Sequence, residues 1–382
     1  MKITFSASAF AEAAKIVRNV RDASLRIDIL DHALVAVEGE TLALTMSDTD
    51  MEVRALIDCT GDTDVRAAIP AAVLDFFVVR AAAGEAEASM EFDDAMLNVT
   101  ARHGKARMTM AILQADIFPV FDTASTTWSL PLRAHELCTL FSVTQKAIAV
   151  DKSRAYLEGV FLNSRDGELT AVALDGHRMH VATVDLPPVE GNLPMRAAGL
   201  PGVIIPAGAV IEILKIFSGD ESEVRVSGTE SKFVVEGERI RIASKLIDGT
   251  YPDYARLLVE PGEFRLGVES AQLEQALASL AVIPRTDGKG KALQSRAIQV
   301  TAEPDAILIE TRGDSGDADI RVPATIEGQG HPFGVNARLL REAVAAAGGG
   351  KIVIAPAGEQ TQALRLLPQA EGRAFIVMQM RY

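Results

Sequence analysis

The sequence has few aromatic residues and few cysteines. Aromatic side chains make up 5% of the 382 residues and hydrophobic ones 48%, so the cores must be built mainly from aliphatic side chains. Cys59 and Cys138 lie far apart and lack the spacing of a metal site, which favours buried or free thiols in a reducing compartment. No apolar run approaches the ~18 residues of a membrane span, and no signal peptide is recognisable. We therefore expect a cytoplasmic protein.

An excess of basic residues is also missing. The net charge is −14, whereas proteins that bind phosphate backbones usually carry a basic excess. A net charge is an average, however, and a protein can concentrate its positive charge on one surface while it stays acidic elsewhere. The acidic composition alone therefore does not exclude nucleic acid as a partner.

Known catalytic motifs are absent. We find no nucleophile elbow, no phosphate-binding loop and no zinc spacing, and the glycine-rich run at 345–351 lacks the strand, glycine loop and helix order that a phosphate loop needs. This run is interpreted as a helix stop. The sequence predicts neither a cofactor nor a metal.

The segment LDGHRMH at 174–180 contains the residues most suggestive of chemistry. Asp175, His177, Arg178 and His180 lie close together, and the Asp-Gly pair predicts a turn. A general base needs an orienting partner and a substrate pocket, and the sequence shows neither. Two interpretations remain open from these residues: a turn with a structural or binding role, or a catalytic or metal site.

What the sequence does contain is a repeat with a period near 130 residues. Three segments each begin with a short strand and continue as an amphipathic helix: ITFSASAFAEAAKIV from Ile3, LPLRAHELCTLFSVT from Leu130 and FRLGVESAQLEQALASL from Phe264. Phe5, Leu132 and Val268 occupy equivalent places. Five residues later, so do Phe10, Leu137 and Leu273, and apolar residues follow at helical spacing.

A second helix is predicted in the middle of each repeat, from Ile69, Ile205 and Val335. Pro70 and Pro206 mark helix starts, and Gly84, Gly219 and Gly348 mark helix stops. Alternating strands such as LALTM, LTAVAL and AILIE lie between the helices, and ARMTMAIL, IRIASKLI and AFIVMQM close the repeats. Helices and strands do not alternate strictly, which favours an α+β fold with antiparallel sheets. We predict three similar domains, at 1–122, 128–258 and 263–382.

The predicted helices are close to neutral although the chain is strongly acidic. If the helices form one surface, any contact with DNA there would be sparse, directed at phosphates and independent of base sequence. A solvated helix face would show the same pattern. The candidate DNA-facing residues are Lys15, Arg18, Arg80, Lys146, Lys215, Arg338 and Arg341 within the helices, and Arg21, Lys152 and Arg154 near helix ends.

The chain ends in AFIVMQMRY, which is apolar and rich in methionine. Because chain termini are usually polar and frayed, this segment is predicted to be a strand or the lip of a groove. Methionine adapts to several partners. A buried last strand without a binding role remains the alternative.

Several sequence segments resemble those of the β sliding clamp family of bacterial DNA polymerase III, and the resemblance extends over the whole chain. The most specific segments are SKLIDGTYPDY at 244–254, SRAYLEGV at 153–160, LDGHRMH at 174–180 and VMQMRY at 377–382. The resemblance implies a non-enzymatic protein with three clamp domains per subunit. Two subunits would join head to tail into a ring that encircles double-stranded DNA.

The resemblance also implies a hydrophobic cleft that binds short peptides of the polymerase, the clamp loader and repair proteins. By this resemblance the cleft consists of Leu157, Leu174, Gly176, His177, Arg178, Met179, Pro252, Arg256, Leu257, Val377, Met378, Met380 and Arg381. His177 would then be a pocket wall and not a catalyst. The subunit interface would pair an edge strand around Met108 and Met110 with the helix end near Val282 and Ile283.

The chain departs from the family pattern at several positions. Gln379 replaces the usual proline, Tyr382 replaces an aliphatic last residue, and Gly334 and Ala337 replace larger pocket residues. The first repeat is the least similar. These departures lie at positions that bear on the peptide preference. The alternative interpretation is a divergent second clamp with a specialised repair or regulatory role. A hydrolase or metalloenzyme that uses Asp175, His177 and His180 is the third alternative.

Overall fold

The computed structural model describes residues 1–21, 27–62, 64–93, 95–197, 199–281, 297–313, 316–357 and 363–382. The described residues group into two compact units. Unit 1 comprises Met1–His135, Pro187–Leu193 and Ile211–Leu246, and unit 2 comprises Glu136–Leu186, Pro194–Val210 and Ile247–Tyr382. Both units draw on the segment 128–258, so the division into three domains at 1–122, 128–258 and 263–382 stays a prediction. We call these three segments the first, second and third repeats.

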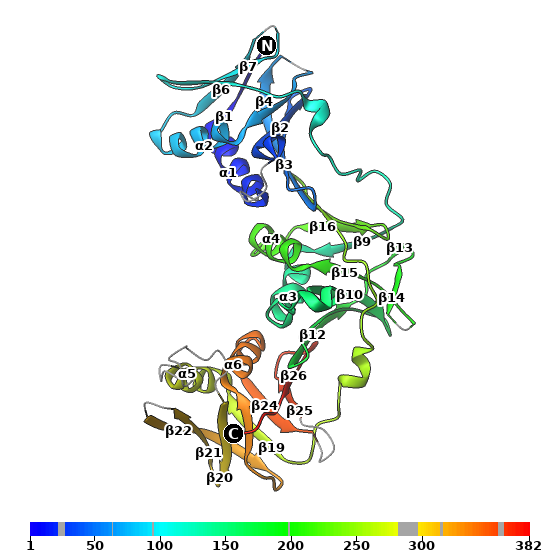
Figure 1. The fold of residues 1–382 in the computed structure, drawn as a ribbon, viewed down its shortest axis with the longest axis vertical. Coiled ribbons are helices and arrows are strands. Elements are labelled where there is room, and N and C mark those ends of the chain that lie inside the picture. Colours follow the sequence, from blue (N-terminus) through cyan, green and yellow to red (C-terminus); the bar gives the residue numbers. More distant parts are fainter. Residues whose placement is uncertain are drawn as a thin grey trace. The chain divides into compact units, whose positions relative to one another are not determined.

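Each unit contains one 13-stranded sheet (Figure 1). In unit 1 the strands follow the order β13-β9-β16-β17-β18-β4-β1-β6-β7-β8, and β3 joins β2 and β5 to β4. The strands are β1 (Lys2–Ser6), β2 (His32–Glu38), β3 (Thr41–Ser47), β4 (Met51–Gly61), β5 (Arg66–Pro70), β6 (Glu87–Phe92), β7 (Asn98–His103), β8 (Ala106–Ala111), β9 (Trp128–Arg133), β13 (Glu190–Gly191), β16 (Glu223–Gly228), β17 (Lys232–Glu236) and β18 (Ile240–Lys245).

The sheet of unit 2 follows the order β14-β15-β10-β11-β12-β26-β25-β24-β19-β22-β21-β20-β23. Its strands are β10 (Gly159–Arg165), β11 (Glu168–Leu174), β12 (Arg178–Asp185), β14 (Met195–Ala197), β15 (Leu200–Pro206), β19 (Arg265–Glu269), β20 (Ala297–Glu303), β21 (Ala306–Gly313), β22 (Gly316–Glu327), β23 (Phe333–Asn336), β24 (Lys351–Pro356), β25 (Ala363–Pro368) and β26 (Arg373–Met378). Neighbouring strands such as β11–β12, β12–β26 and β25–β26 run antiparallel. The α+β fold with antiparallel sheets is confirmed.

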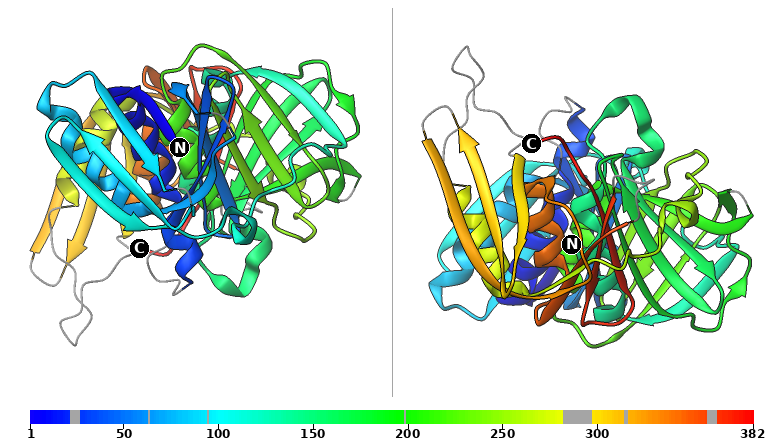
Figure 2. Two further views of the ribbon diagram at one scale, coloured as in Figure 1. Left: turned by 90° about the horizontal axis from the view of Figure 1, so that it is seen from above. Right: turned by 90° about the horizontal axis from the view of Figure 1, so that it is seen from below.

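The α-helices occur at the predicted places. They are α1 (Ala7–Val17), α2 (Ala71–Arg80), α3 (Ala134–Thr144), α4 (Ala207–Phe217), α5 (Ser270–Leu280) and α6 (Ala337–Ala346). In unit 1, α1 packs against α2, and in unit 2, α5 packs against α6, which lie side by side in yellow and orange in Figure 2. No helix in the described part of the chain is long and apolar enough to cross a membrane.

Local signals in the sequence determine where these helices begin and end. The Ser6 side chain accepts a hydrogen bond from the main-chain N–H of Ala9 at the start of α1, and Asn336 accepts from Arg338 and Leu339 at the start of α6. Such caps satisfy N–H groups that have no partner within the helix. The predicted stops at Gly84, Gly219 and Gly348 all adopt positive φ, which costs glycine little.

The three repeats predicted from the sequence bury equivalent helix residues. The first helix of each repeat has eleven residues, and its fourth residue is fully buried. These residues are Phe10, Leu137 and Leu273. The single tryptophan, Trp128, is also buried and packs near Phe233. Both cysteines are buried.

Candidate functional site

An apolar cavity of about 370 Å³ lies within unit 2. Its wall is formed by the β11–β12 turn, the short helix η7 (Tyr254–Leu257) with the segment after it, and the strands β25 and β26. Leu257 and Met378 leave 45% and 38% of their surface exposed, so the cavity offers apolar side chains to an incoming ligand. The lining residues are Leu174, Gly176, Arg178, Met179, Arg256, Leu257, Val259, Ala363, Ile376 and Met378.

Strand pairing brings these residues together from distant parts of the sequence. Leu174 pairs with Met179 across β11 and β12, and Met179 pairs with Ile376 across β12 and β26. Residues paired across adjacent strands share one face of the sheet, so these three side chains form one apolar floor. They belong to a buried cluster that also includes Phe161 and Tyr251, whose rings stack at 4.8 Å.

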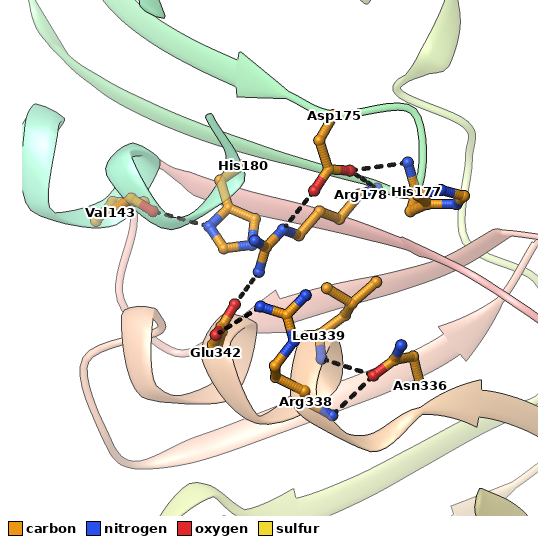
Figure 3. Close-up of polar contacts among 9 residues, drawn as sticks. All are labelled: Val143, Asp175, His177, Arg178, His180, Asn336, Arg338, Leu339 and Glu342. Atoms are coloured by element: carbon orange, nitrogen blue, oxygen red, sulfur yellow. Dashed lines mark hydrogen bonds and ion pairs between the residues drawn. The ribbon is translucent and has the colours of Figure 1, made fainter. Parts of the chain in front are cut away.

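The turn at one edge of the cavity is held by Asp175. Its Oδ1 atom accepts hydrogen bonds from the main-chain N–H groups of His177 (2.8 Å) and Arg178 (3.0 Å). Its Oδ2 atom accepts from Nε of Arg178 at 3.1 Å, as Figure 3 shows. Gly176 completes the turn with φ of +90°. The Asp-Gly turn predicted from the sequence is confirmed.

The two histidines near this turn differ in their surroundings. His177 is exposed, whereas His180 is fully buried, and its Nδ1–H donates to the main-chain carbonyl of Val143 at 2.9 Å. Burial lowers the pKa of His180 to about 4, so the ring is neutral at physiological pH. Among the described residues, no group of three or more His, Cys, Asp and Glu side chains could hold a metal ion.

The cleft residues expected from the resemblance divide into two sets. Leu174, Gly176, Arg178, Met179, Arg256, Leu257 and Met378 line the cavity. The remaining expected residues, Leu157, His177, Pro252, Val377, Met380 and Arg381, are not part of its lining. Leu157 lies in the same buried cluster as the floor residues and Val377 is fully buried, so these two are core residues of unit 2. The role of all these residues in binding stays a prediction.

Three lining residues were not predicted from the sequence: Val259, Ala363 and Ile376. For Ile376 a signal existed, because side chains alternate between the two faces of a strand. Met378 was expected in the cleft, and Ile376 lies two residues before it on the same face, while Val377 points to the other side. Val259 and Ala363 carry no comparable signal, since a loop and a short strand bring them to the cavity.

Comparison with known proteins identifies the family. Residues 131–253 match the model of the central domain of the DNA polymerase III beta subunit, a range within the predicted second domain. The beta sliding clamp of Salmonella typhimurium is 30% identical over 280 residues, which cover 72% of this chain and 73% of that protein. The chain belongs to the beta sliding clamp family. Its function is that of a DNA sliding clamp in DNA replication.

Full-length relatives support the same assignment. The beta sliding clamp of Caulobacter vibrioides is 29% identical over 394 residues and is matched over 100% of both chains. The crystal structure of the DNA polymerase sliding clamp from Caulobacter crescentus superposes with a TM-score of 0.86, again over 100% of both chains, at 25% identity. The DNA clamp fold therefore extends over the entire sequence.

The candidate DNA-facing cations differ in their partners. Half of them form ion pairs: Arg18 with Asp75 (2.6 Å), Arg21 with Asp31 (2.5 Å), Arg154 with Asp151 (3.8 Å), Lys215 with Glu212 (3.0 Å) and Arg338 with Glu342 (3.6 Å). Within the described ranges, Lys15, Arg80, Lys146, Lys152 and Arg341 have no acidic partner within 4.0 Å. The positive charge available to a partner is thus smaller than the residue count suggests.

The strand that carries Met108 and Met110 is an edge strand. β8 ends the sheet of unit 1 and pairs with β7. Met108 and Met110 lie two residues apart and are both half-buried, as expected for one face of an edge strand. The other two residues expected at the interface, Val282 and Ile283, lie outside the described residues.

Proposed function

We propose that two copies of this clamp form a closed ring around double-stranded DNA, and that the apolar cavity of unit 2 binds peptides of partner proteins. The DNA polymerase, the clamp loader and other replication and repair proteins would use short extended segments with apolar anchors. The observation that carries this proposal is the cavity itself. It has apolar walls, two half-exposed anchoring side chains in Leu257 and Met378 and a volume of about 370 Å³.

A ring relieves the clamp of the need for tight DNA contacts. DNA that passes through a closed ring is held by topology, so a few weak contacts to phosphates are sufficient and sliding stays unhindered. The five candidate cations that have no acidic partner within 4.0 Å among the described residues, Lys15 and Lys146 among them, supply such contacts in this proposal. An acidic chain with nearly neutral helices is compatible with that role.

Edge strand β8 is the proposed contact with the second subunit. An edge strand presents N–H and C=O groups that lack partners within its own sheet. Pairing of β8 with a strand of the other subunit satisfies these groups and continues the sheet across the interface, with Met108 and Met110 contributing apolar contact. Val282 and Ile283 remain the proposed residues on the opposite side.

In this proposal the protein is a non-catalytic accessory subunit. It requires no cofactor and no metal, and it works in the cytoplasm, where bacterial DNA is replicated. His177 and His180 are assigned no chemistry. His177 is a solvent-exposed residue of the turn and His180 is part of the core.

The cleft assignment is tested by fluorescence anisotropy with a labelled Gln-x-x-Leu-x-Phe peptide. We expect saturable binding near micromolar Kd, which corresponds to about −8 kcal/mol. The double variant Leu257→Ala, Met378→Ala should bind at least about tenfold more weakly, because each truncation removes apolar surface worth about 1 kcal/mol or more. The matched control is Val79→Ala, which truncates a side chain of unit 1 that is 76% exposed. Equal affinity of the double variant and the control would contradict the assignment.

A further inference from the structure

Two arginines, Arg178 and Arg256, line the otherwise apolar cavity. The side chain of Arg256 is 85% exposed, and its Nε atom pairs with Oδ2 of Asp253 at 2.8 Å. Arg178 lines the cavity, yet its side chain is only 6% exposed. The guanidinium lies between two carboxylates (Figure 3): its Nε atom is 3.1 Å from Oδ2 of Asp175, and its Nη1 atom pairs with Oε2 of Glu342. The second oxygen of Glu342 lies 3.6 Å from Nη1 of Arg338. Two cations and two carboxylates thus form a neutral cluster beside the cavity.

The turn itself does not require an arginine. In the first repeat, Asp48 holds the β3–β4 turn in the same way, with Oδ1 accepting from the main-chain N–H groups of Asp50 (2.9 Å) and Met51 (2.7 Å). Residues 47 and 52 pair across that turn as residues 174 and 179 pair across the other. Met51 therefore occupies the place of Arg178. The arginine side chain must be explained by what surrounds it, and not by the turn.

Glu342 reaches Arg178 from a different part of the sequence. It lies on α6 in the third repeat, its side chain is 23% exposed, and it is not part of the cavity lining. Without it, Asp175 would be the one acidic partner left to Arg178 among the described residues, and the cluster would carry one net positive charge. A partly buried cation without full compensation attracts anions strongly, because the surroundings screen it poorly.

We propose that Glu342 sets the ligand specificity of the cavity by positioning and neutralising Arg178. With Glu342 in place, the guanidinium is held towards α6 with its charge balanced, and the cavity accepts an uncharged apolar anchor. A peptide with a carboxylate in place of its apolar anchor finds no uncompensated cation there and is rejected, because Arg178 is paired with Glu342 and the exposed Arg256 is paired with Asp253 and screened by solvent. This inference rests on the proposed peptide-binding function of the cavity. Glu342 is a positioning residue in it, since it acts only through Arg178.

The test compares two labelled probes on intact protein, a Gln-x-x-Leu-x-Phe peptide and the same peptide with glutamate in place of its leucine. Wild type should prefer the leucine probe by at least about tenfold in Kd. Glu342→Gln should reduce this preference about tenfold, mainly through tighter binding of the glutamate probe, and that gain should disappear at high salt. Glu342→Asp, which keeps the charge, should retain most of the preference.

A second background shows whether the effect passes through Arg178. In Arg178→Met, the residue found at the equivalent place of the first repeat, adding Glu342→Gln should leave the preference unchanged. Equal weakening of both probes by Glu342→Gln, or an unchanged preference in a folded variant, would overturn the inference alone. Failure of wild type to bind the leucine probe at all would instead overturn the proposed peptide cleft, and this inference with it.

Discussion

The main-chain N–H of Met380 donates a hydrogen bond of 2.9 Å to the carbonyl oxygen of Gly334. A β-bridge between Val335 and Gln379 adjoins it, so the last residues of the chain run alongside β23. A Cβ atom at position 334 would lie 2.3 Å from the carbonyl oxygen of Met380. The tail can occupy this place only because residue 334 has no side chain.

Replacing Gly334 by valine should therefore release the tail. The added side chain collides with main-chain atoms that cannot move without breaking the bridge, and overpacking of this kind costs about 1–3 kcal/mol. Carboxypeptidase digestion followed by mass spectrometry should show faster loss of residues 379–382 than in wild type. The matched control is Gly208→Ala in α4, where a Cβ meets nothing within 4 Å. A tail as resistant in Gly334→Val as in the control would contradict this account.

Asp48 and Asp175 hold equivalent turns, so their alanine variants can be compared to measure what the Arg178 ion pair adds to local stability. Each aspartate accepts two main-chain hydrogen bonds, and in the part of the chain that the structure describes Asp175 also binds an arginine whereas Asp48 does not. Asp48→Ala should lower the local free energy of opening by about 1–2 kcal/mol. Asp175→Ala should lower it by a further 1–3 kcal/mol or so, because Arg178 is nearly buried and loses one of two acidic partners. Hydrogen exchange at the two turns measures both values, and equal losses would show that the arginine pair contributes nothing to stability.

Burial of His180 predicts a pH dependence of stability. Its pKa is lowered from 6.5 to about 4 by burial, so the unfolded chain binds a proton more readily than the folded one. The resulting stability is fully present above pH 6.5 and is lost as the pH falls towards 4, by up to about 3 kcal/mol. We expect the difference in unfolding free energy between wild type and His180→Leu, measured with urea, to shrink over this range. A difference that is constant with pH would rule out the neutral buried ring.

The candidate DNA-facing cations should differ according to their partners. Lys15→Ala with Lys146→Ala removes two exposed cations without acidic partners within 4.0 Å among the described residues, while Arg18→Ala with Arg21→Ala removes two ion-paired ones. Both double variants change the net charge by the same amount. The first should reduce the salt dependence of DNA affinity, the slope of log K against log salt, by about 1.8, and the second by less than half of that. Equal slopes would show that these ion pairs do not shield the arginines from DNA.

Local sequence signals predicted the fold well. Apolar spacing from Phe10, Leu137 and Leu273 located the first helix of each repeat, and Pro70 and Pro206 located the starts of α2 and α4. These signals act over a few residues, which is the range at which a sequence can be interpreted directly. The closing strands ARMTMAIL, IRIASKLI and AFIVMQM began within one residue of β8, β18 and β26, but each was predicted two residues too long at its end.

The candidate site was predicted only in part, because tertiary contacts complete it. The Asp-Gly turn was evident from neighbouring residues. Arg178, however, forms an ion pair with Glu342, which lies 164 positions away in the sequence, and no local sequence pattern predicts such a pair. Val377 was expected in the cleft while Ile376 was not. Alternation from Met378 indicated Ile376, but which face of β26 meets the cavity is decided by the sheet that the strand joins. Gly334 was noted as a departure from the family pattern, and its contact with Met380 supplies the physical reason.

Retention on circular DNA tests the central claim most directly. The clamp, loaded by its own clamp loader onto a singly nicked plasmid, should remain with the DNA during gel filtration. It should be released when a single cut linearises the plasmid, because a ring held by topology slides off a free end. A clamp that stays on the linearised DNA, or that is never retained on the circle, would contradict the proposal that this chain encircles duplex DNA.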